Sequence, residues 1–432
     1  MIRQNFNADW TVEKGDGNSR MNSFLGNTQT QTVHLPYDAM IHEARTPDTK
    51  NGAQTGFYPG GEYIFQKHFT APQAWQGKPV SLVFEGVYQT ALVYLNGWLL
   101  TRNVNGYAEF TVEADPYLKY GADNLLKVIA DNSLEPNSRW YTGSGIYRPV
   151  RLLVGNKVYL PQDTVRITTR EVGEGFALVD VTAQVQSASA VTERVTLQQT
   201  ICREGMAVLT DRQNLLLQPG ESRIVSFRYC VDSPALWSPE NPNLYTSTMQ
   251  VLEGEEELDR EETSFGIRTL SIDASHGVRI NGQTVKLRGA CIHHDNGILG
   301  AATLPDAEER RIRQLKEAGF NAIRSSHHPA GRALLDACDR YGVLVMDELS
   351  DVWNVRKNPY DYALYFEQDW KPTIQKMVAK DYNHPSVILY CVGNEISEAG
   401  SESGAETNRR LCNTFRELDP TRYTTNALNG LM

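Results

Sequence analysis

The chain has 432 residues, a formal net charge of −10 and a hydrophobic content of 41%, values typical of a soluble globular protein of about three domains. The acidic balance argues against nucleic acid or an anionic membrane as the main partner. No apolar run reaches the roughly 18 residues that span a bilayer, and the N-terminal segment lacks the apolar stretch of about 7–15 residues found in secretory signals.

The six cysteines are far apart in the sequence and form no CxxC pair. Cys291 and Cys391 lie inside apolar, strand-like runs, so we expect small buried side chains in a reducing compartment instead of a disulfide framework or a zinc site. The sequence therefore predicts a cytoplasmic protein. It leaves homo-oligomerisation open.

The first block, residues 1–160, is predicted to be all β-structure. The segment "KPVSLVFEGVYQTALVYLNGWLL" (78–100) contains two strands, with Asn96-Gly97 in the position of a hairpin turn. Further strands are separated by clusters of Gly, Asn, Asp and Pro. Because the block is long and irregular, we interpret it as a jelly-roll-like β-sandwich.

The second block, residues 161–268, alternates polar and apolar residues over several short strands. Its length of about 100 residues and its strand spacing are typical of an immunoglobulin-like β-sandwich. The charge run "EGEEELDREE" (253–262) is interpreted as a solvated hairpin.

From residue 269 to residue 432, apolar strand runs alternate with helix-length amphipathic segments. In "DAEERRIRQLKEAG" (306–319) the apolar residues recur at helical spacing, and Gly319 lies where a helix C-cap belongs. Strands with little internal polarity, each followed by a helix, indicate parallel strands covered by helices. A (β/α)₈ barrel and an open doubly wound sheet both fit this pattern. No GxGxxG or GxxxxGK[ST] motif is present.

Polar residues follow four successive strands of this third block. They are His293-His294, Ser325 to His328, Asp347-Glu348 and Asn394-Glu395. The carboxyl ends of TIM-barrel strands converge on the catalytic face. We therefore predict an incomplete (β/α)₈ TIM barrel that ends near strand five, with these side chains at its mouth.

Three kinds of function fit such a mouth. A Glu at a strand end can protonate a glycosidic oxygen, and a second carboxylate then acts as nucleophile or base. Alternatively, the two His-His pairs and Asp347-Glu348 could ligate a divalent ion for metal-assisted hydrolysis. Adjacent strand residues point to opposite faces, however, so at most one member of each pair faces inward. The third alternative is a non-catalytic carbohydrate-binding protein.

Five segments resemble regions of glycoside hydrolase family 2, which includes β-galactosidases, β-glucuronidases and β-mannosidases. They are "WYTGSGIYRPVRL" (140–152), "PALWSPENPNLYT" (234–246), "VKLRGACIHHDNG" (285–297), "NAIRSSHHPAGRALLDACDRYGVLVMDE" (321–348) and "DYNHPSVILYCVGNE" (381–395). The resemblance covers essentially the whole chain and is strongest to the β-galactosidase branch, as the loop segment 351–370 also suggests.

The resemblance implies that Glu395 is the general acid/base and that Asn394 contacts the sugar hydroxyl next to the anomeric carbon. The other positions that it implies around the bound sugar are His293, His327, Asp347, Glu348 and Arg324. Of Asp347 and Glu348, we expect one to line the pocket and the other to brace Arg324. His328 is expected to be structural, and His293 is favoured over His294 as the inward member of its pair. Trp140 and Tyr141 could stack on sugar, but we interpret them as core residues.

The resemblance also has limits. The Glu-x-His that binds magnesium in some family β-galactosidases is not found after Glu348, so we assign no metal and no cofactor. The family's nucleophile is a second Glu near strand seven, and we expect this chain to end near strand five. The resemblance therefore implies a fragment of a retaining exo-glycosidase that lacks its nucleophile and is nearly inert alone. The expected substrates are terminal non-reducing β-D-glycosides, foremost β-galactosides, with β-glucuronides and β-mannosides as alternatives.

Overall fold

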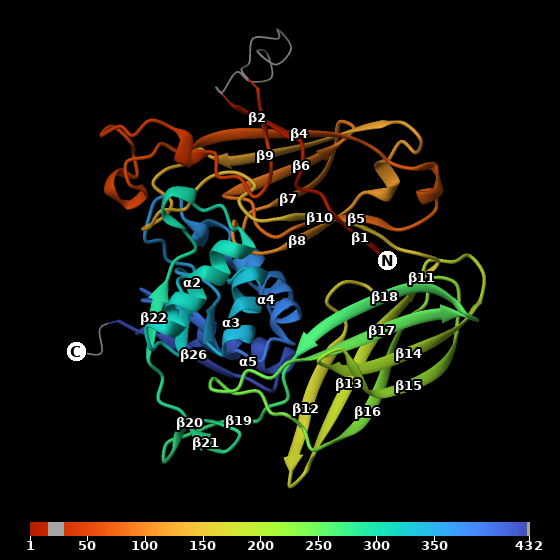
Figure 1. Cartoon of the computed structure of the whole chain (residues 1–432). Helices are drawn as coiled ribbons and strands as arrows, with labels where there is room; N and C mark the ends of the chain where they lie inside the picture. The colour runs from red at the N-terminus through yellow and green to blue at the C-terminus, as the bar shows by residue number, and fades with distance from the viewer. Residues whose placement is uncertain (16–29, 430–432) are drawn as a thin grey trace.

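The computed structural model describes residues 1–15 and 30–429, so the last three residues of the third predicted domain lie outside the described part. The first β-sandwich lies above a partial barrel and a second β-sandwich, which lie side by side (Figure 1). The described residues include no helix that is both long and apolar enough to cross a membrane.

The first sandwich packs a six-stranded sheet, in the order β3-β2-β4-β9-β6-β7, on a four-stranded sheet, in the order β1-β10-β5-β8. Alternating inward residues such as Phe65 and Phe84 are fully buried between the sheets. The predicted hairpin turn at Asn96 and Gly97 is confirmed, with φ angles of 53° and 89°. The strands are Ile2–Asn5 (β1), Trp10–Lys14 (β2), Gln31–Val33 (β3), Gly61–Thr70 (β4), Val80–Phe84 (β5), Thr90–Leu95 (β6), Trp98–Asn103 (β7), Phe110–Glu113 (β8), Asp123–Asn132 (β9) and Val150–Val154 (β10).

The second sandwich consists of the sheet β11-β13-β12, with β16 paired to β13, and the sheet β15-β14-β17-β18. The predicted boundary assigned β11 to the first domain, but it pairs with β13 of the second sandwich. The charge run forms the turn of the β17–β18 hairpin and most of β18, and its residues are exposed or half-buried except Leu258 and Asp259. The strands are Val158–Tyr159 (β11), Arg166–Gly173 (β12), Phe176–Ser187 (β13), Glu193–Arg203 (β14), Met206–Leu217 (β15), Ser222–Asp232 (β16), Tyr245–Glu253 (β17) and Glu256–Phe265 (β18).

A small sheet of Leu270–Asp273 (β19), Gly277–Ile280 (β20) and Gln283–Thr284 (β21) leads into the partial barrel. The barrel sheet has five parallel strands in the order β22-β23-β24-β25-β26. These strands are Gly289–Ile292, Ala322–Ser325, Leu344–Glu348, Val387–Asn394 and Tyr423–Ala427.

Four helices cover the outside of this sheet (Figure 1). Gly319, with φ of +90°, follows the first helix and allows the chain to turn back toward β23. The helices are Pro305–Glu317 (α2), Arg332–Tyr341 (α3), Phe366–Asp381 (α4) and Glu402–Leu418 (α5). Short 3-10 helices occupy Met40–His42, Gly52–Thr55, Gln73–Trp75, Asp115–Tyr117, Gly297–Leu299 and Tyr362–Leu364.

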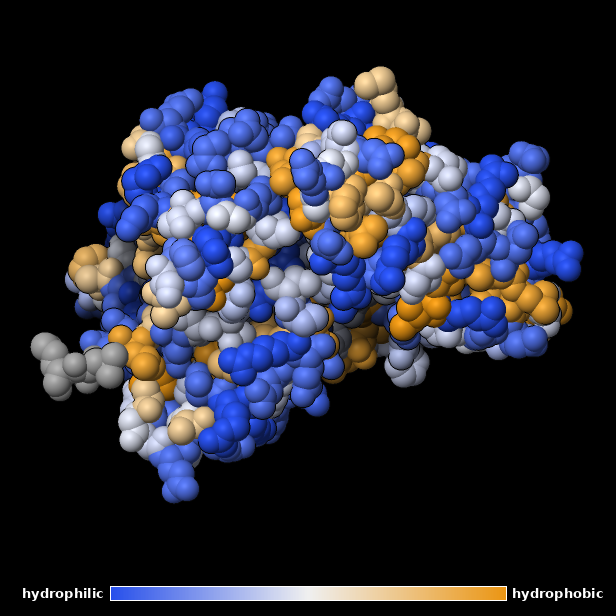
Figure 2. Space-filling model, turned by 90° about the horizontal axis from the view of Figure 1, so that it is seen from below, coloured by the Kyte–Doolittle hydropathy of each residue, from blue (hydrophilic) through white to orange (hydrophobic). Residues whose placement is uncertain are grey.

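The two outer strands of the barrel sheet, β22 and β26, pair with no further strand among the described residues. Cys291 on β22 is therefore exposed, whereas we expected a buried side chain, while Cys391 on the inner strand β25 is buried as expected. An apolar hollow of about 220 Å³ opens beside the first four strands. The face seen from below carries separate hydrophobic patches within a largely hydrophilic surface (Figure 2).

Trp237 joins the second sandwich to the barrel. Its side chain is fully buried, and its indole N–H donates to the backbone carbonyl of Asp339 on α3 at 2.9 Å. Arg268 from the same region donates to the carbonyls of Pro385 and Val387 at 2.6 and 2.8 Å. The start of β25 is therefore held by the second sandwich.

Replacing Trp237 by Ala should lower the free energy of unfolding by about 3–5 kcal/mol, because it leaves a large cavity and an unpaired carbonyl. The measurement is urea-induced unfolding, followed by circular dichroism. The matched control is Trp98→Ala, since Trp98 is 65% exposed and its loss should change stability by no more than about 0.5 kcal/mol. Equal effects of the two changes would contradict the packing described here.

Candidate active site

Strand β25 ends at Asn394, and Glu395 follows with a φ of +45°. This conformation is uncommon for a residue with a side chain and is found disproportionately at functional sites. The amide of Glu395 donates to the carbonyl of Ala427 at 2.7 Å. A Cβ atom on the preceding Gly393 would lie 2.7 Å from Ile396 and 2.8 Å from Trp353, so glycine is required there. The Glu395 side chain is 44% exposed.

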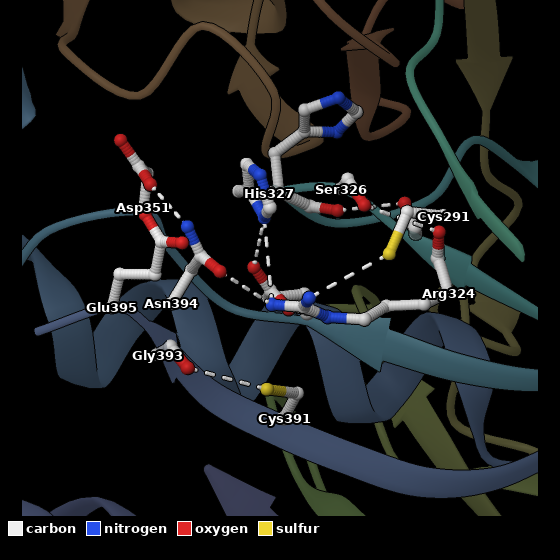
Figure 3. Close-up of polar contacts among 12 residues, drawn as sticks. Cys291, Arg324, Ser326, His327, Asp351, Cys391, Gly393, Asn394 and Glu395 are labelled. Carbon is white, nitrogen blue, oxygen red and sulfur yellow. Dashed lines mark hydrogen bonds and ion pairs between the residues drawn. The ribbon is translucent and has the colours of Figure 1, made fainter. Parts of the chain in front are cut away.

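Asn394 is held at both ends of its side-chain amide. Its carbonyl oxygen accepts from Arg324 at 2.9 Å, and its NH₂ group donates to Asp351 at 2.8 Å. Figure 3 shows Asn394 between Arg324 and Asp351, with Glu395 next to it at the same strand end. The amide orientation is therefore set, and one N–H of Asn394 remains available for a ligand.

Glu348 lies beneath these residues with a fully buried side chain. It accepts from the Arg324 guanidinium at 2.5 Å and lies 2.7 Å from Nδ1 of His327. Glu348 thus braces Arg324, one of the two roles that we expected for the Asp347-Glu348 pair.

Asp347 does not line the site, so the interpretation of this residue as sugar-binding has to be corrected. Its carboxylate accepts from the amide of Ala330 at 2.8 Å and lies 3.9 Å from the Lys380 ammonium group. Burial, followed by the charge of Asp381, raises its pKa well above the ordinary value. The physical reason is strand alternation, which turns Asp347 and Glu348 to opposite faces of β24.

The histidine pairs also divide between two faces. His293 stacks on Trp140 with ring centroids 5.1 Å apart and meets His327 edge-on at 5.5 Å. Burial, with the neighbouring His327 as the next cause, lowers the pKa of His293. His293, His327 and Trp140 therefore form one wall beside Arg324.

The second members of the pairs pack against the first sandwich. His328 stacks on Tyr107 at 3.9 Å, and His294 lies 2.9 Å from the Thr142 carbonyl. Burial lowers the pKa of His294 to about 3 and depresses that of His328 as well. His328 thus lies where a structural residue was expected, and His294 is the member of its pair that faces away from the site.

The two members of each histidine pair face opposite ways and cannot act as joint ligands. The metal-hydrolase alternative is therefore left with one histidine from each pair, His293 and His327, on the wall beside Arg324. In the described part of the chain, three potential ligands come together only at Asp336, Asp339 and His384. Asp339 and His384 already contact each other at 2.6 Å, and α3, which carries the two aspartates, lies outside the barrel sheet.

The structure adds four residues that the sequence analysis did not assign to the site: Arg139, Trp140, Asp351 and Lys357. The guanidinium of Arg139 donates to Asp351 at 2.7 and 3.1 Å and to Glu395 at 3.4 Å. Lys357 donates to Asp351 at 2.9 Å and to the backbone carbonyl of Asn394 at 2.7 Å. Two sequence signals concerned them: the Trp-Tyr pair at 140–141, which we interpreted as core, and the loop segment 351–370, which contains Asp351 and Lys357.

The environment of Asp351 favours its ionised form. Burial opposes ionisation, but hydrogen bonds from Arg139 and Asn394 and the charge of Lys357 outweigh it and hold the pKa of Asp351 below its usual value. A negative charge is therefore kept at the centre of this rim.

The two adjacent carboxylates of β24 should respond differently to amide substitution. Glu348→Gln should cost about 3–5 kcal/mol of unfolding free energy, because the partly buried Arg324 loses its counter-charge. Asp347→Asn should cost no more than about 1 kcal/mol, because the raised pKa of Asp347 already favours its neutral form. Urea unfolding at pH 7 measures both. A larger cost for Asp347→Asn would contradict the assignment of faces.

Three family descriptions match successive parts of the chain. Residues 10–163 match the galactose-binding domain-like region of glycosyl hydrolase 2, residues 158–268 match glycosyl hydrolases family 2, and residues 273–429 match the family 2 TIM barrel domain.

Curated relatives include beta-galactosidase BoGH2A of Bacteroides ovatus, 37% identical over 94% of this chain and 48% of its own length. A putative beta-glucuronidase of Formosa agariphila is 32% identical over 98% of this chain and 40% of its own length. The chain thus spans about half the length of the curated relatives that it matches.

Solved structures of glycosidases are also similar to this chain. A glycosyl hydrolase family 2 member from Bacteroides cellulosilyticus superposes with a TM-score of 0.96 at 36% identity, over 100% of this chain and 56% of that one. A Bacteroides uniformis beta-glucuronidase superposes with a TM-score of 0.85 at 27% identity, over 99% of this chain and 52% of that one. The chain belongs to glycosyl hydrolase family 2 and contains its N-terminal sandwich, its immunoglobulin-like domain and part of its TIM barrel.

Proposed function

We propose that the protein to which this chain belongs is a retaining exo-glycosidase that removes terminal β-D-galactosyl residues, with Glu395 as its general acid/base. The observation that carries the proposal is the position of Glu395 at the carboxyl end of β25, half exposed and directly after Asn394, whose amide is held by Arg324 and Asp351. The family membership supports glycoside hydrolysis as the reaction.

In the first step, the Glu395 carboxyl group donates a proton to the oxygen of the departing group while a second carboxylate attacks the anomeric carbon. In the second step, the Glu395 carboxylate takes a proton from water, which attacks the same carbon and releases the sugar with retained configuration. In this proposal, the remaining N–H of Asn394 and the rings of His293 and His327 bind sugar hydroxyl groups.

Neither Asp351 nor Glu348, the two carboxylates held within this network, is a suitable nucleophile. A retaining site needs the second carboxylate about 5–5.5 Å from the acid, and it must be free to form a bond to carbon. Asp351 is held by Arg139, Lys357 and Asn394, and Glu348 is held by Arg324. We therefore assign the nucleophile to a Glu outside these 432 residues, and this polypeptide alone should be nearly inert.

The charges around the site favour a neutral sugar. Arg324 pairs with Glu348, while Arg139 and Lys357 both pair with Asp351. None of these three cations is left without a counter-ion to bind the carboxylate of a glucuronide. This supports a β-galactoside over a β-glucuronide, and so does the name of the Bacteroides ovatus relative.

The cellular location and the assembly are separate proposals. All six cysteines are free, and three of them are buried, which is compatible with the reducing cytoplasm that we expect. Homo-oligomerisation stays a prediction, which light scattering of the purified protein would test.

The test of the function is Glu395→Gln in the longest natural protein that contains this chain. With 4-nitrophenyl β-galactoside, kcat should fall by about 10²–10⁴-fold, because the amide can neither donate nor accept the proton. Glu402→Gln is the matched control, since Glu402 is exposed at the start of α5 and should leave turnover unchanged.

Other results would point elsewhere. Unchanged turnover in Glu395→Gln would reject the proposed acid/base. Preferential cleavage of the β-glucuronide or β-mannoside would keep the reaction class and reject the sugar. Saturable sugar binding without turnover in the unaltered protein would support a carbohydrate-binding protein instead.

A further inference from the structure

Arg139 belongs to the first sandwich but reaches the mouth of the barrel. It lies in the connection between β9 and β10, more than 200 positions before the residues that it contacts. Its Nε and Nη2 atoms donate to the two carboxylate oxygens of Asp351 at 3.1 and 2.7 Å, and Nη1 donates to Oε2 of Glu395 at 3.4 Å. One planar guanidinium group thus joins two carboxylates.

The backbone around Arg139 is held on both sides. Before it, the Asn137 side chain donates to Asn132 at 2.7 Å, and the Ser138 hydroxyl donates to the carbonyl of Trp140 at 3.1 Å. After it, the Trp140 indole donates to the Tyr107 hydroxyl at 3.0 Å and stacks on His293. Because both neighbours are tied down, the start of the Arg139 side chain is fixed relative to the barrel.

The other end of the contact is equally restrained. Asp351 is only 9% exposed and also accepts from Asn394 and Lys357. Lys357 in turn donates to the carbonyl of Asn394, the residue before Glu395. Two of the three donor nitrogens of Arg139 are therefore fixed by a rigid partner, and the third is left to face Glu395.

Glu395, by contrast, has little else to hold it. It is 44% exposed, and a glutamate side chain with three rotatable bonds samples many rotamers. Within the described part of the chain, the side-chain group that lies within hydrogen-bond distance of its carboxylate is the Arg139 guanidinium. Catalytic proton transfer requires that this carboxylate stay close to one position.

We propose that Arg139 is a positioning residue for Glu395, so that the first sandwich completes the catalytic machinery of the barrel. The inference rests on the proposed role of Glu395. Asp351 orients the guanidinium and offsets its charge, and Arg139 restricts the Glu395 carboxylate to conformers at the barrel rim. A lysine cannot replace it, because one ammonium group cannot make the two-pronged contact with Asp351 and also reach Glu395.

The test uses the longest natural protein that contains this chain. It compares two substrates whose leaving groups differ in their need for protonation by an acid. A 2,4-dinitrophenolate leaves without protonation, whereas a 4-methoxyphenolate needs a proton from Glu395. In Arg139→Gln, kcat/KM for the 4-methoxyphenyl β-galactoside should fall by about 10–100-fold, and the value for the 2,4-dinitrophenyl β-galactoside by less than about 3-fold. Arg139→Lys should show the same selectivity, because its ammonium group cannot bind Asp351 with two donors and also reach Glu395.

The matched control is Arg102→Gln. Arg102 also links the first sandwich to a barrel loop, through the hydroxyl and ring of Tyr365, but it does not contact Glu395. It should retain the kinetics of the unaltered protein with both substrates. Adding Arg139→Gln to Glu395→Gln should cause little further loss, because a positioning residue has nothing to position once the acid is gone.

The outcomes separate the two proposals. Equal losses on both substrates in Arg139→Gln, or no loss on either, would overturn the positioning role, as would additive losses in the double variant. A Glu395→Gln variant that discriminates between the two substrates, beside an Arg139→Gln variant that does not, would reject this inference alone. A Glu395→Gln variant without discrimination would reject the proposed function itself.

Discussion

The site depends on one network of charges at the carboxyl ends of the barrel strands. Asp351 is its centre, because it binds Arg139 from the first sandwich, Lys357 from its own loop and Asn394 from the end of β25. Each of these groups would be costly to bury alone, and each is balanced by the others. The polar groups at the mouth of the barrel therefore hold one another in position.

A second pair supports this network from below. Glu348 is buried under Arg324 and fixes the position of its guanidinium group. Arg324 in turn donates a hydrogen bond of 2.9 Å to Asn394 and so orients its side chain. The sandwiches complete the arrangement from outside. The first supplies Arg139 and Trp140 to the rim. The second holds the beginning of β25 through Arg268 and binds α3 through Trp237. The two sandwiches thus act on opposite ends of the barrel strands.

Much of this could be predicted from the sequence, because hydrophobic periodicity is a local property. The alternating strands before residue 269 indicated β-sandwiches, and the strand–helix repeats after it indicated a parallel sheet. Strand alternation also limited each adjacent pair to one inward residue. Alternation does not determine which member of a pair faces inward. For Asp347 and Glu348, this was decided by the register of β24 in the folded sheet.

The sequence by itself determined the order of the domains, the succession of polar strand ends and the position of Glu395 directly after a buried strand. Only the tertiary structure decided that Arg139 and Trp140 belong to the site, that Cys291 lies on an exposed outer strand, and that Asp347 faces away. The physical reason is that contacts between residues 139 and 351 or 395 depend on how separate domains pack. No periodicity within one segment encodes that packing.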